Sequence, residues 1–423
     1  MALGTITGKG PDTVGVEFLN GLDTLVTTAF SNNSSDKSSI NLSGKNTKAF
    51  FVQGGNYSLS GINTKLSGDD TLGIYIAAPA TQEQPTTAAA STANPTSTGA
   101  TASPSQPTAT SVTLTGNNTF DISKGTVFYI KGNAESADKA TLTLGDSFKG
   151  TFSESTETLA TVVDQGKLIV NTDVTAAIKT TKTDTVDRLN KGIGLIVQNG
   201  AVQVADSKSL TLNVQSEKGV GAYLNNADTS GTIKVDLQGK DQVGAYLTGT
   251  LKSVPQVNAS AASSPTYYIV DKVTTVAQDF SFPTIELNVD NSIGLSTKKL
   301  PDGEAAPATP ITLTTSGITI TGNNSIGIYN QGPYSIKNVG ALRVNDATKD
   351  NKRNIGIYSQ GGVITQKGDI SVGKNSIGIY SEYEPKPVTE AVTTPPVPST
   401  ITVTGDMTVE PEGVGLYLSL IHI

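Results

Sequence analysis

The chain has 423 residues, including 43 glycines, no cysteine and no tryptophan, with 5% aromatic residues and a net charge of −7. The lack of cysteine excludes disulfides and thiolate metal sites and suits an exported protein, while the mild acidity argues against nucleic acid or an anionic membrane as partner. No stretch approaches the roughly 20 apolar residues that a membrane-spanning helix needs. The shortage of large aromatics fits a narrow core of Ile, Val, Leu and Ala.

The amino-terminal residues are expected to continue a repeat rather than to begin a protein. Residues 1–10 lack the basic and apolar regions of a signal peptide, and residues 5–7 and 13–16 already alternate like the later strands. Further short strands are predicted at 39–42 and within 59–68. The last repeat strand runs into residues 419–423 without a polar cap, and residues 421–423 match nothing in the repeat, so this tail is a candidate for foreign sequence. We therefore expect an internal fragment of a longer protein.

Four Pro-rich stretches interrupt the strands and are predicted to be disordered insertions, because they contain few residues that can pack. They lie at 81–110, 254–265, 300–310 and 384–398. The last three each follow a repeat strand, so they would project from one corner of the coil. That corner is either a functional face or simply one that tolerates insertion. Between 140 and 195 the period is hard to follow, and 185–189 has the pattern of a short helix.

From residue 209 onward a repeat is plain, and its clearest copy is Asn-Asn-Ser-Ile-Gly-Ile-Tyr at 323–329. The central positions of successive copies give intervals of 244 − 221 = 23, 221 − 194 = 27, 356 − 327 = 29 and 378 − 356 = 22. The shortest unit, 359–380, holds three short strands near Val363, Ile370 and Ile377, separated by glycine-containing turns. Three strands and three turns form one coil of a parallel β-helix, in which each strand pairs with its equivalent one coil away. We therefore predict an all-β chain that forms one solenoid over residues 1–423.

Side-chain alternation along the motif strand predicts which residues face the core. If Ile326 and Ile328 point inward, Gly327 and Tyr329 must point outward. The same assignment in every copy produces an outward column of tyrosines: Tyr75, Tyr129, Tyr223, Tyr246, Tyr329, Tyr358, Tyr380 and Tyr417. This column is the candidate interaction site, because tyrosine commonly anchors sugar- or protein-binding surfaces. The alternative is that the rings stack on one another and hold the strands in register.

No catalytic, cofactor-binding or metal-binding constellation is expected. The one histidine, His422, lies in the atypical tail, so no Ser/His/Asp triad or histidine metal site can be assembled. Asp69 and Asp70 resemble the paired carboxylates of polygalacturonase-like glycosidases. They occupy the turn position that Asn324 and Asn375 fill in other coils, and Asp, Asn and Gly all tolerate left-handed backbone there. A turn is therefore the preferred interpretation of the pair.

The Asn-Ser-Ile-Gly-Ile-Tyr repeats, in a cysteine-free chain with variable unit length, resemble the passenger region of large Gram-negative autotransporter adhesins of the fusobacterial type. The resemblance implies a right-handed β-helix on the cell surface, exported through a carboxyl-terminal outer-membrane β-barrel that this chain does not include. It also implies attachment to a protein or glycan on host cells or other bacteria. The alternative is a β-helical polysaccharide-degrading enzyme, similar to a phage tailspike or a pectinase.

Overall fold

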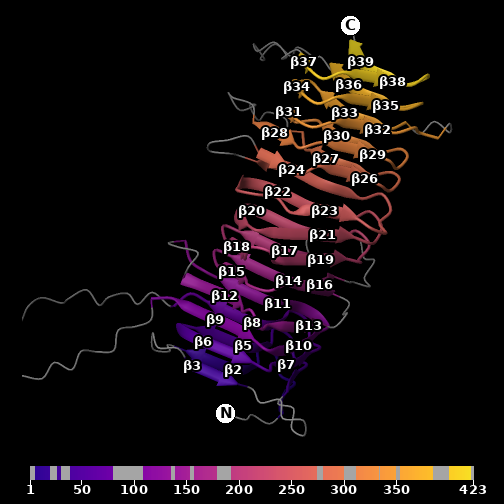
Figure 1. Ribbon diagram of the computed structural model, residues 1–423. Coiled ribbons are helices and arrows are strands. Elements are labelled where there is room, and N and C mark those ends of the chain that lie inside the picture. Colours follow the sequence, from indigo (N-terminus) through magenta and orange to yellow (C-terminus); the bar gives the residue numbers. More distant parts are fainter. Residues whose placement is uncertain are drawn as a thin grey trace, which may run out of the picture. The chain divides into compact units, whose positions relative to one another are not determined.

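The computed structural model describes residues 5–19, 26–29, 39–79, 108–134, 139–152, 157–178, 192–273, 280–299, 311–332, 334–348, 353–383 and 400–420. These residues form strands β1 to β39 and contain no α-helix (Figure 1). Contacts divide the chain into two compact units: residues 1–153 with 163–172, and residues 154–162 with 173–423. Strand β14 (Glu157–Asp164) is divided between them. Continuity of the two units in one solenoid stays a prediction.

The first unit consists of three ladders of parallel strands. Within each ladder the strands lie one above the other and are joined by hydrogen bonds (Figure 1). The first ladder is β1 (Ile6–Gly8), β4 (Ile40–Leu42), β7 (Asn63–Leu66), β10 (Asn117–Ile122) and β13 (Lys149–Phe152). The second is β2 (Val14–Leu19), β5 (Lys48–Gln53), β8 (Thr71–Ala77) and β11 (Lys124–Lys131). The third is β3 (Val26–Ala29), β6 (Gly55–Ser60), β9 (Thr110–Thr115), β12 (Ala140–Leu144) and β15 (Lys167–Val170).

The second unit repeats this organisation over more coils. Its longest ladder is β17 (Ile193–Gln198), β20 (Val220–Ser230), β22 (Val243–Leu251), β24 (Thr266–Val273), β27 (Ile293–Thr297), β30 (Ile326–Asn330), β33 (Ile355–Gln360), β36 (Ile377–Tyr383) and β39 (Val414–Leu420). Strand β18 (Ala201–Val204) also pairs with β20.

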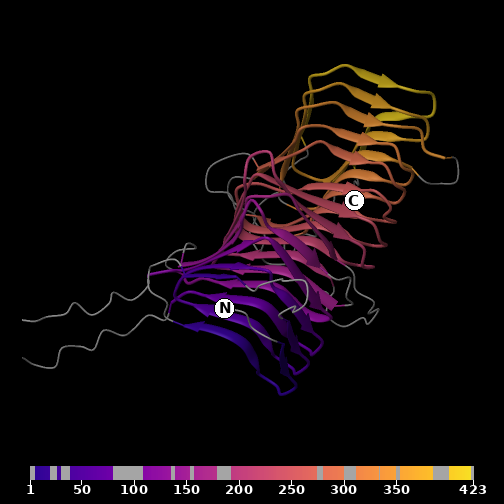
Figure 2. The same cartoon turned by 60° about the horizontal axis from the view of Figure 1, so that its bottom comes forward.

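Three shorter parallel ladders complete the coils of the second unit (Figure 2). They are β16 (Val174–Ile178), β19 (Ser209–Val214), β21 (Thr232–Leu237) and β23 (Gln256–Ala259); β25 (Phe280–Phe282), β28 (Thr312–Thr315), β31 (Ser335–Asn338), β34 (Val363–Gln366) and β37 (Thr400–Val403); and β26 (Ile285–Leu287), β29 (Ile318–Ile320), β32 (Leu342–Val344), β35 (Ile370–Val372) and β38 (Met407–Val409).

The predicted 22-residue coil at 359–380 is confirmed strand by strand. Strands β34, β35 and β36 begin at Val363, Ile370 and Ile377. Gly361 and Gly362 make the first turn with φ of 84° and 86°, which favours glycine because it has no Cβ. The prediction of an all-β chain built from stacked parallel strands is therefore confirmed, and the arrangement is compatible with a parallel β-helix.

The core of the second unit contains columns of aliphatic side chains and also columns of buried amides and hydroxyls. Ile328, Ile357 and Ile379 are each 0% exposed and follow one another in register on β30, β33 and β36. In another ladder Thr315, Asn338 and Gln366 are also 0% exposed. The Thr315 hydroxyl donates to Asn338 Oδ1 at 2.9 Å, and Asn338 Nδ2 donates to Gln366 Oε1 at 2.8 Å. Each of these three side chains thus has a hydrogen-bond partner in a neighbouring coil, as burial of polar groups requires.

The predicted orientation of the motif glycine is wrong. Gly327 is buried and Ile326 is half-buried, while Ile328 is buried and Tyr329 half-buried as predicted. A Cβ built on Gly327 would meet the Gly356 carbonyl oxygen and, at 2.6 Å, Ile318 Cγ2 of the core. The alternation of inward and outward side chains therefore fails at this glycine. In the parallel register Ile326 pairs with Ile355 and Ile328 with Ile357, whereas Gly327 has no paired residue. The strand turns two consecutive residues inward, and at Gly327 the Gly356 carbonyl and the Ile318 side chain leave no room for a Cβ.

The equivalent position accepts larger residues where the neighbouring coils differ. The same correction applies in the second unit to Gly221, which is buried, and to Val220, which is half-buried. In the first unit the register places Ala49 and Val127 beside Gly73, and both are buried. The residue at this position thus points inward in every copy named here, and the packing of the neighbouring coils decides how large its side chain can be.

The prediction of a disordered insertion at 254–265 is wrong. Residues 256–259 form β23, which pairs with β21 through Val257 opposite Val235 and Ala259 opposite Leu237. Tyr268 fixes the start of this segment, because its hydroxyl donates to the Pro255 carbonyl at 2.9 Å. Residues 108–110, predicted as part of the first insertion, are also described, and Thr110 begins β9. The remaining insertions (81–107, 300–310 and 384–398), the predicted helix at 185–189 and residues 421–423 lie outside the described residues.

Candidate binding surface

The strand register brings the predicted tyrosines together in separate runs. In the first unit Tyr129 on β11 lies opposite Tyr75 on β8, and Tyr75 lies opposite Phe51 on β5. In the second unit Tyr223 on β20 lies opposite Tyr246 on β22. The longest run is Tyr329, Tyr358, Tyr380 and Tyr417 on β30, β33, β36 and β39. Ile269 and Ser296 occupy the equivalent positions between Tyr246 and Tyr329, so the column in this unit is interrupted.

The rings of the longest run stack almost parallel to one another. Their centroids are 4.9 Å apart from Tyr329 to Tyr358, 5.2 Å from Tyr358 to Tyr380 and 4.8 Å from Tyr380 to Tyr417, with interplanar angles of 18°, 17° and 13°. These separations follow from the spacing of strands in a parallel sheet, about 4.8 Å. The ring faces are therefore occupied by neighbouring rings, and the column presents ring edges and hydroxyl groups.

Polar side chains bind the hydroxyl of Tyr358. It donates to Glu382 Oε2 at 2.6 Å and accepts a hydrogen bond from Gln360 Nε2 at 3.1 Å. Gln331 Nε2 donates in turn to Gln360 Oε1 at 3.3 Å. Burial raises the pKa of Tyr358, and the hydrogen bond to Glu382 raises it further. Two residues beyond Tyr329, Tyr358 and Tyr380, a second column of Gln331, Gln360 and Glu382 thus runs beside the rings.

Tyr246, the last residue of the shorter run in the second unit, contacts two charged side chains, those of Asp271 and Lys298. Its hydroxyl donates to Asp271, and Lys298 Nζ donates to that hydroxyl at 2.6 Å. Lys298 also lies 3.3 Å from Asp271 and 4.8 Å from the centroid of the Tyr246 ring, as a cation–π contact. Burial raises the pKa of Tyr246, while its hydrogen bond raises that of Lys298. The lysine therefore reaches across the coil that carries Ile269.

In the first unit the column is flanked by an ion pair. Tyr75 stacks on Phe51 with centroids 5.4 Å apart and on Tyr129 at the same distance with a larger tilt, 50° against 21°. Lys131, two residues after Tyr129, forms an ion pair with Asp164, and this hydrogen bond raises the pKa of the lysine. Burial raises the pKa of both tyrosines. The sequence analysis missed Phe51 as a member of the column, although Phe51 on β5 lies opposite Tyr75 on β8.

Replacing Tyr380 by serine is expected to lower the free energy of unfolding by about 2–3 kcal/mol, because this ring stacks on both neighbours and each aromatic pair is worth roughly 0.5–1.5 kcal/mol beyond its buried area. Tyr380→Phe keeps both stacks and is expected to stay within about 0.5 kcal/mol of the parent chain. Urea denaturation followed by circular dichroism measures both values. Equal stability of the serine and phenylalanine variants would show that stacking does not hold these strands.

The unfolding free energy is also expected to fall as the pH rises above about 10, the usual tyrosine pKa. Burial raises the pKa of Tyr267, Tyr268 and Tyr358, so the folded chain keeps protons that the unfolded chain releases. These tyrosines contribute fully to the free energy of unfolding at a pH below their pKa in the unfolded chain. The contribution is lost as the pH rises through their pKa in the folded chain. Urea midpoints at about pH 8 and about pH 11 test this, and Tyr358→Phe is expected to reduce the difference. A midpoint that is unchanged across this interval would contradict it.

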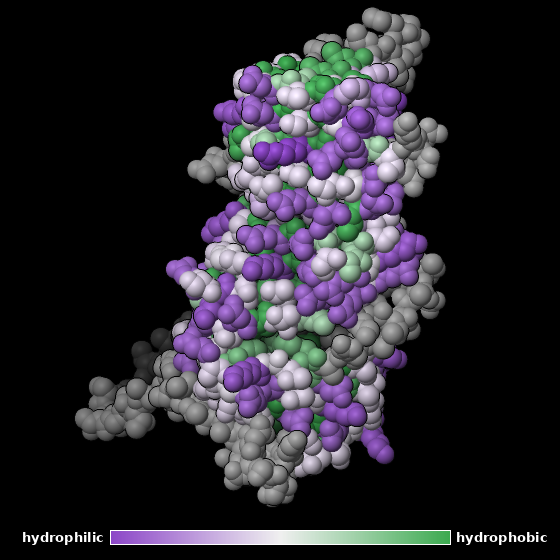
Figure 3. Space-filling view, turned by 45° about the vertical axis from the view of Figure 1, so that its right-hand side comes forward, coloured by the Kyte–Doolittle hydropathy of each residue, from purple (hydrophilic) through white to green (hydrophobic). Residues whose placement is uncertain are grey.

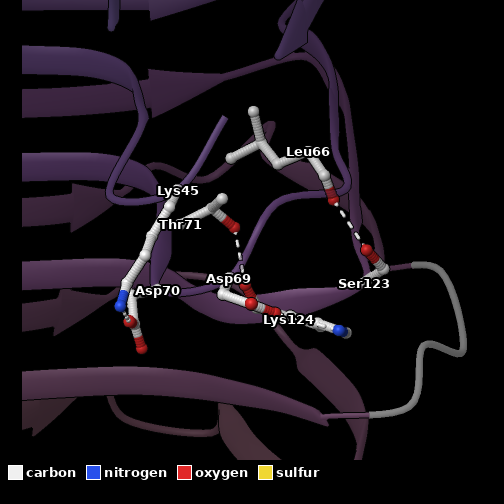
Figure 4. Close-up of polar contacts among 7 residues, drawn as sticks. All are labelled: Lys45, Leu66, Asp69, Asp70, Thr71, Ser123 and Lys124. Atoms are coloured by element: carbon white, nitrogen blue, oxygen red, sulfur yellow. Dashed lines mark hydrogen bonds and ion pairs between the residues drawn. The ribbon is translucent and has the colours of Figure 1, made fainter. Parts of the chain in front are cut away.

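The two aspartates singled out in the sequence lie in an exposed turn (Figure 4). Asp70 has φ of 55°, and the equivalent turn residues Asn46, Asp241, Asn324 and Asn375 have φ between 53° and 56°. Lys124 Nζ donates to Asp69 Oδ1 at 2.9 Å, and Lys45 Nζ lies 3.7 Å from Asp70 Oδ2 (Figure 4). The interpretation as a left-handed turn is confirmed. Each carboxylate faces its own lysine on the surface.

Two further kinds of feature were sought in the described part of the chain, a metal site and a membrane-spanning helix. It contains no group of three or more His, Asp or Glu side chains arranged to hold a metal. None of its elements is a helix long and apolar enough to cross a membrane. No family model matches the chain, and no match was found among curated proteins or solved structures. Function is therefore inferred from residues and geometry.

Proposed function

We propose that the chain is a surface-exposed autotransporter passenger segment that acts as an adhesin or structural stalk in attachment to host cells or other bacteria. The observation that carries the proposal is the tyrosine column, held at the spacing of the coils on a shaft of stacked parallel strands. The motif that builds this column is also the one that resembles fusobacterial autotransporter adhesins. Right-handed coiling belongs to the proposal, because parallel strands in one sheet are connected with this hand in nearly all proteins.

A repeated surface suits attachment through many weak contacts. In the run from Tyr329 to Tyr417 each coil offers a ring edge and a hydroxyl, and Gln360 and Glu382 add amide and carboxylate groups beside them. Tyrosine edges and hydroxyls anchor protein and glycan partners, and many copies per cell multiply a weak affinity. A protein or glycan on another cell is therefore the proposed partner. No cofactor is part of the proposal.

Sequencing the gene on both sides of this segment tests the export route. The proposal expects a signal peptide upstream and, downstream, a run of roughly ten-residue amphipathic strands that form an outer-membrane barrel. A trimerisation domain, a catalytic domain or neighbouring phage tail genes would overturn it. Incubating the purified chain with candidate polysaccharides provides a second test, because steady release of reducing ends or unsaturated products would favour the polysaccharide-degrading alternative.

Replacing Tyr358, Tyr380 and Tyr417 together by serine separates the two roles of the column. Attachment that falls further than the loss of folded protein accounts for would assign binding to the tyrosines. Reduced stability with unchanged attachment per folded molecule would leave them as a device for strand register. The matching triple phenylalanine variant keeps the rings without their hydroxyls, so it reports which part of the side chain a partner contacts.

A further inference from the structure

The run of four stacked tyrosines places oxidisable rings in contact across coils that are far apart in sequence. Tyr358 and Tyr380 are separated by 22 residues, and Tyr380 and Tyr417 by 37 (380 − 358 = 22; 417 − 380 = 37). Their ring centroids are only 5.2 Å and 4.8 Å apart. Tyr329, Tyr358 and Tyr380 are half-buried, so the outer edges of their rings remain within reach of an oxidant in solution. This proximity is useful for chemistry between the rings as well as for packing.

Phenol oxidation by one electron also releases the hydroxyl proton, so a nearby base assists it. Tyr358 already donates its hydroxyl proton to Glu382 Oε2 at 2.6 Å. The carboxylate can therefore accept the proton when the ring loses an electron. The tyrosyl radical that results carries unpaired electron density on the ring carbons ortho to the hydroxyl. Two such radicals on neighbouring rings combine through these carbons.

We propose that Tyr329, Tyr358, Tyr380 and Tyr417 form an oxidative cross-linking site, in which neighbouring rings are joined as dityrosine by hydrogen peroxide and a haem peroxidase. In each coupling two phenol rings lose one electron and one proton each. A carbon–carbon bond then forms between the two ortho positions. The hydrogen on each of these carbons moves as a proton to the oxygen of its ring, which restores the aromatic ring and the hydroxyl. Hydrogen peroxide takes up two electrons and two protons and becomes two molecules of water.

The other tyrosines of the second unit whose side chains the structure describes differ in ways that should make this run react first. Tyr223 and Tyr246 also stack, with centroids 5.5 Å apart. The Tyr246 hydroxyl also donates to a carboxylate, that of Asp271, but this carboxylate is paired with Lys298. The Lys298 ammonium donates to the same hydroxyl and lies over the ring, and positive charge there opposes loss of an electron. Tyr267 and Tyr268 are each 1% exposed and Tyr334 is 4% exposed, so a peroxidase cannot reach them. The Tyr223–Tyr246 stack therefore serves as a control in the same molecule for the Tyr358–Tyr380 stack.

The expected consequence is a covalent seam along the outside of the coils. A bond from Tyr358 to Tyr380 joins β33 to β36, and one from Tyr380 to Tyr417 joins β36 to β39. Like a disulfide, such a bond restricts the unfolded chain more than the folded one and so stabilises the fold. The inference does not depend on the proposed adhesive function. It requires only that the protein meets peroxide and a peroxidase.

Peptide mapping tests the proposal on the full chain. The protein is treated with horseradish peroxidase and hydrogen peroxide at low protein concentration and then cleaved after Lys, Arg and Glu. Cleavage places Tyr358, Tyr380 and Tyr417 in the separate peptides 354–367, 375–382 and 413–423. Mass spectrometry is expected to find these peptides joined in neighbouring pairs with the loss of two hydrogens, together with dityrosine fluorescence in the monomer fraction.

Two variants give the controls. Tyr380→Phe keeps the ring but cannot form a phenoxyl radical, so both links through position 380 should disappear while the Tyr329–Tyr358 link remains. Tyr223→Phe should leave all links in the run intact. Circular dichroism before oxidation shows whether each variant is folded. Cross-links found only between molecules, or joining Tyr223 to Tyr246 as readily as Tyr358 to Tyr380, would overturn the proposal.

Discussion

Replacing Gly327 by alanine is expected to lower the free energy of unfolding by about 1–3 kcal/mol, the usual cost of inserting a methyl group into a filled core. The new Cβ would meet the Gly356 carbonyl oxygen and Ile318 Cγ2, which is part of the core of the next ladder. Relief would require either a shift of Ile318 or separation of two paired strands. Urea denaturation of the two proteins under identical conditions measures the difference.

Gly317→Ala is the matched control, because it makes the same chemical change ten residues away. A Cβ at Gly317 would meet its nearest atoms, the Ala341 carbonyl oxygen and Thr284 Cγ2, at 3.5 Å, which is ordinary van der Waals contact. This variant should be neutral or slightly stabilising. If Gly327 faced solvent, alanine would stabilise the strand there by roughly 0.5–1 kcal/mol. A gain in stability for Gly327→Ala would therefore refute the inward orientation.

Replacing Asn338 by alanine is expected to cost about 3 kcal/mol, because it leaves buried polar groups without partners and each such group costs roughly 1–3 kcal/mol. Asn338 accepts from the Thr315 hydroxyl at 2.9 Å, and it donates to Gln366 Oε1 at 2.8 Å and to the Gly340 carbonyl at 3.1 Å. All three side chains are 0% exposed, so water cannot replace these bonds without opening the coil. Thermal or urea unfolding measures the loss.

Thr365→Ala serves as the control for this ladder. Thr365 precedes Gln366 on β34 and points to the other face, where it is half-buried. Its replacement should change stability by less than about 0.5 kcal/mol. The double variant Thr315→Val with Asn338→Leu should recover part of the loss, since removing both partners leaves fewer unsatisfied groups. A similar, small effect of Asn338→Ala and Thr365→Ala would mean that the buried amides contribute little.

In the coil at 359–380 the repeated motif was sufficient to predict the strands and the turns. Short apolar alternation marks β34, β35 and β36, and the Asn or Asp at each turn does adopt the left-handed conformation, as Asn324 and Asn375 show. Composition failed at 254–265, where Pro, Ser and Ala hide a strand that is set by its neighbour. Val257 pairs there because Val235 on β21 already offers an open edge. Pairing between coils is a tertiary property that local composition does not express.

The candidate surface was predictable in outline and not in detail. Copies of the motif place tyrosines at one point of each coil, and the observed register brings them into stacked runs. The direction of Gly327 was not predictable, because period-two alternation fails where the strand turns two residues inward. Glu382 and Asp271 were also missed as partners. Each contacts a tyrosine of the preceding coil, so its role depends on coil register and not on its own sequence neighbourhood.

The exposed end of the last ladder shows what each coil requires from its neighbour. Leu416 and Leu418 on β39 are 43% and 63% exposed, whereas Ile357 on β33 is 0% exposed. Figure 3 shows hydrophobic residues gathered at this end. A coil buries its apolar residues only when another coil stacks on it.

Attachment of whole cells is the measurement that tests the proposed function most directly. A non-adherent Gram-negative strain would display this chain on an outer-membrane barrel, and its binding to host cells and to other bacteria would be compared with that of the same strain displaying the barrel alone. The proposal predicts more bound cells with the chain, and dose-dependent competition by the purified, folded chain. Equal binding by the two strains, with the chain shown to be folded and on the surface, would contradict a role in attachment.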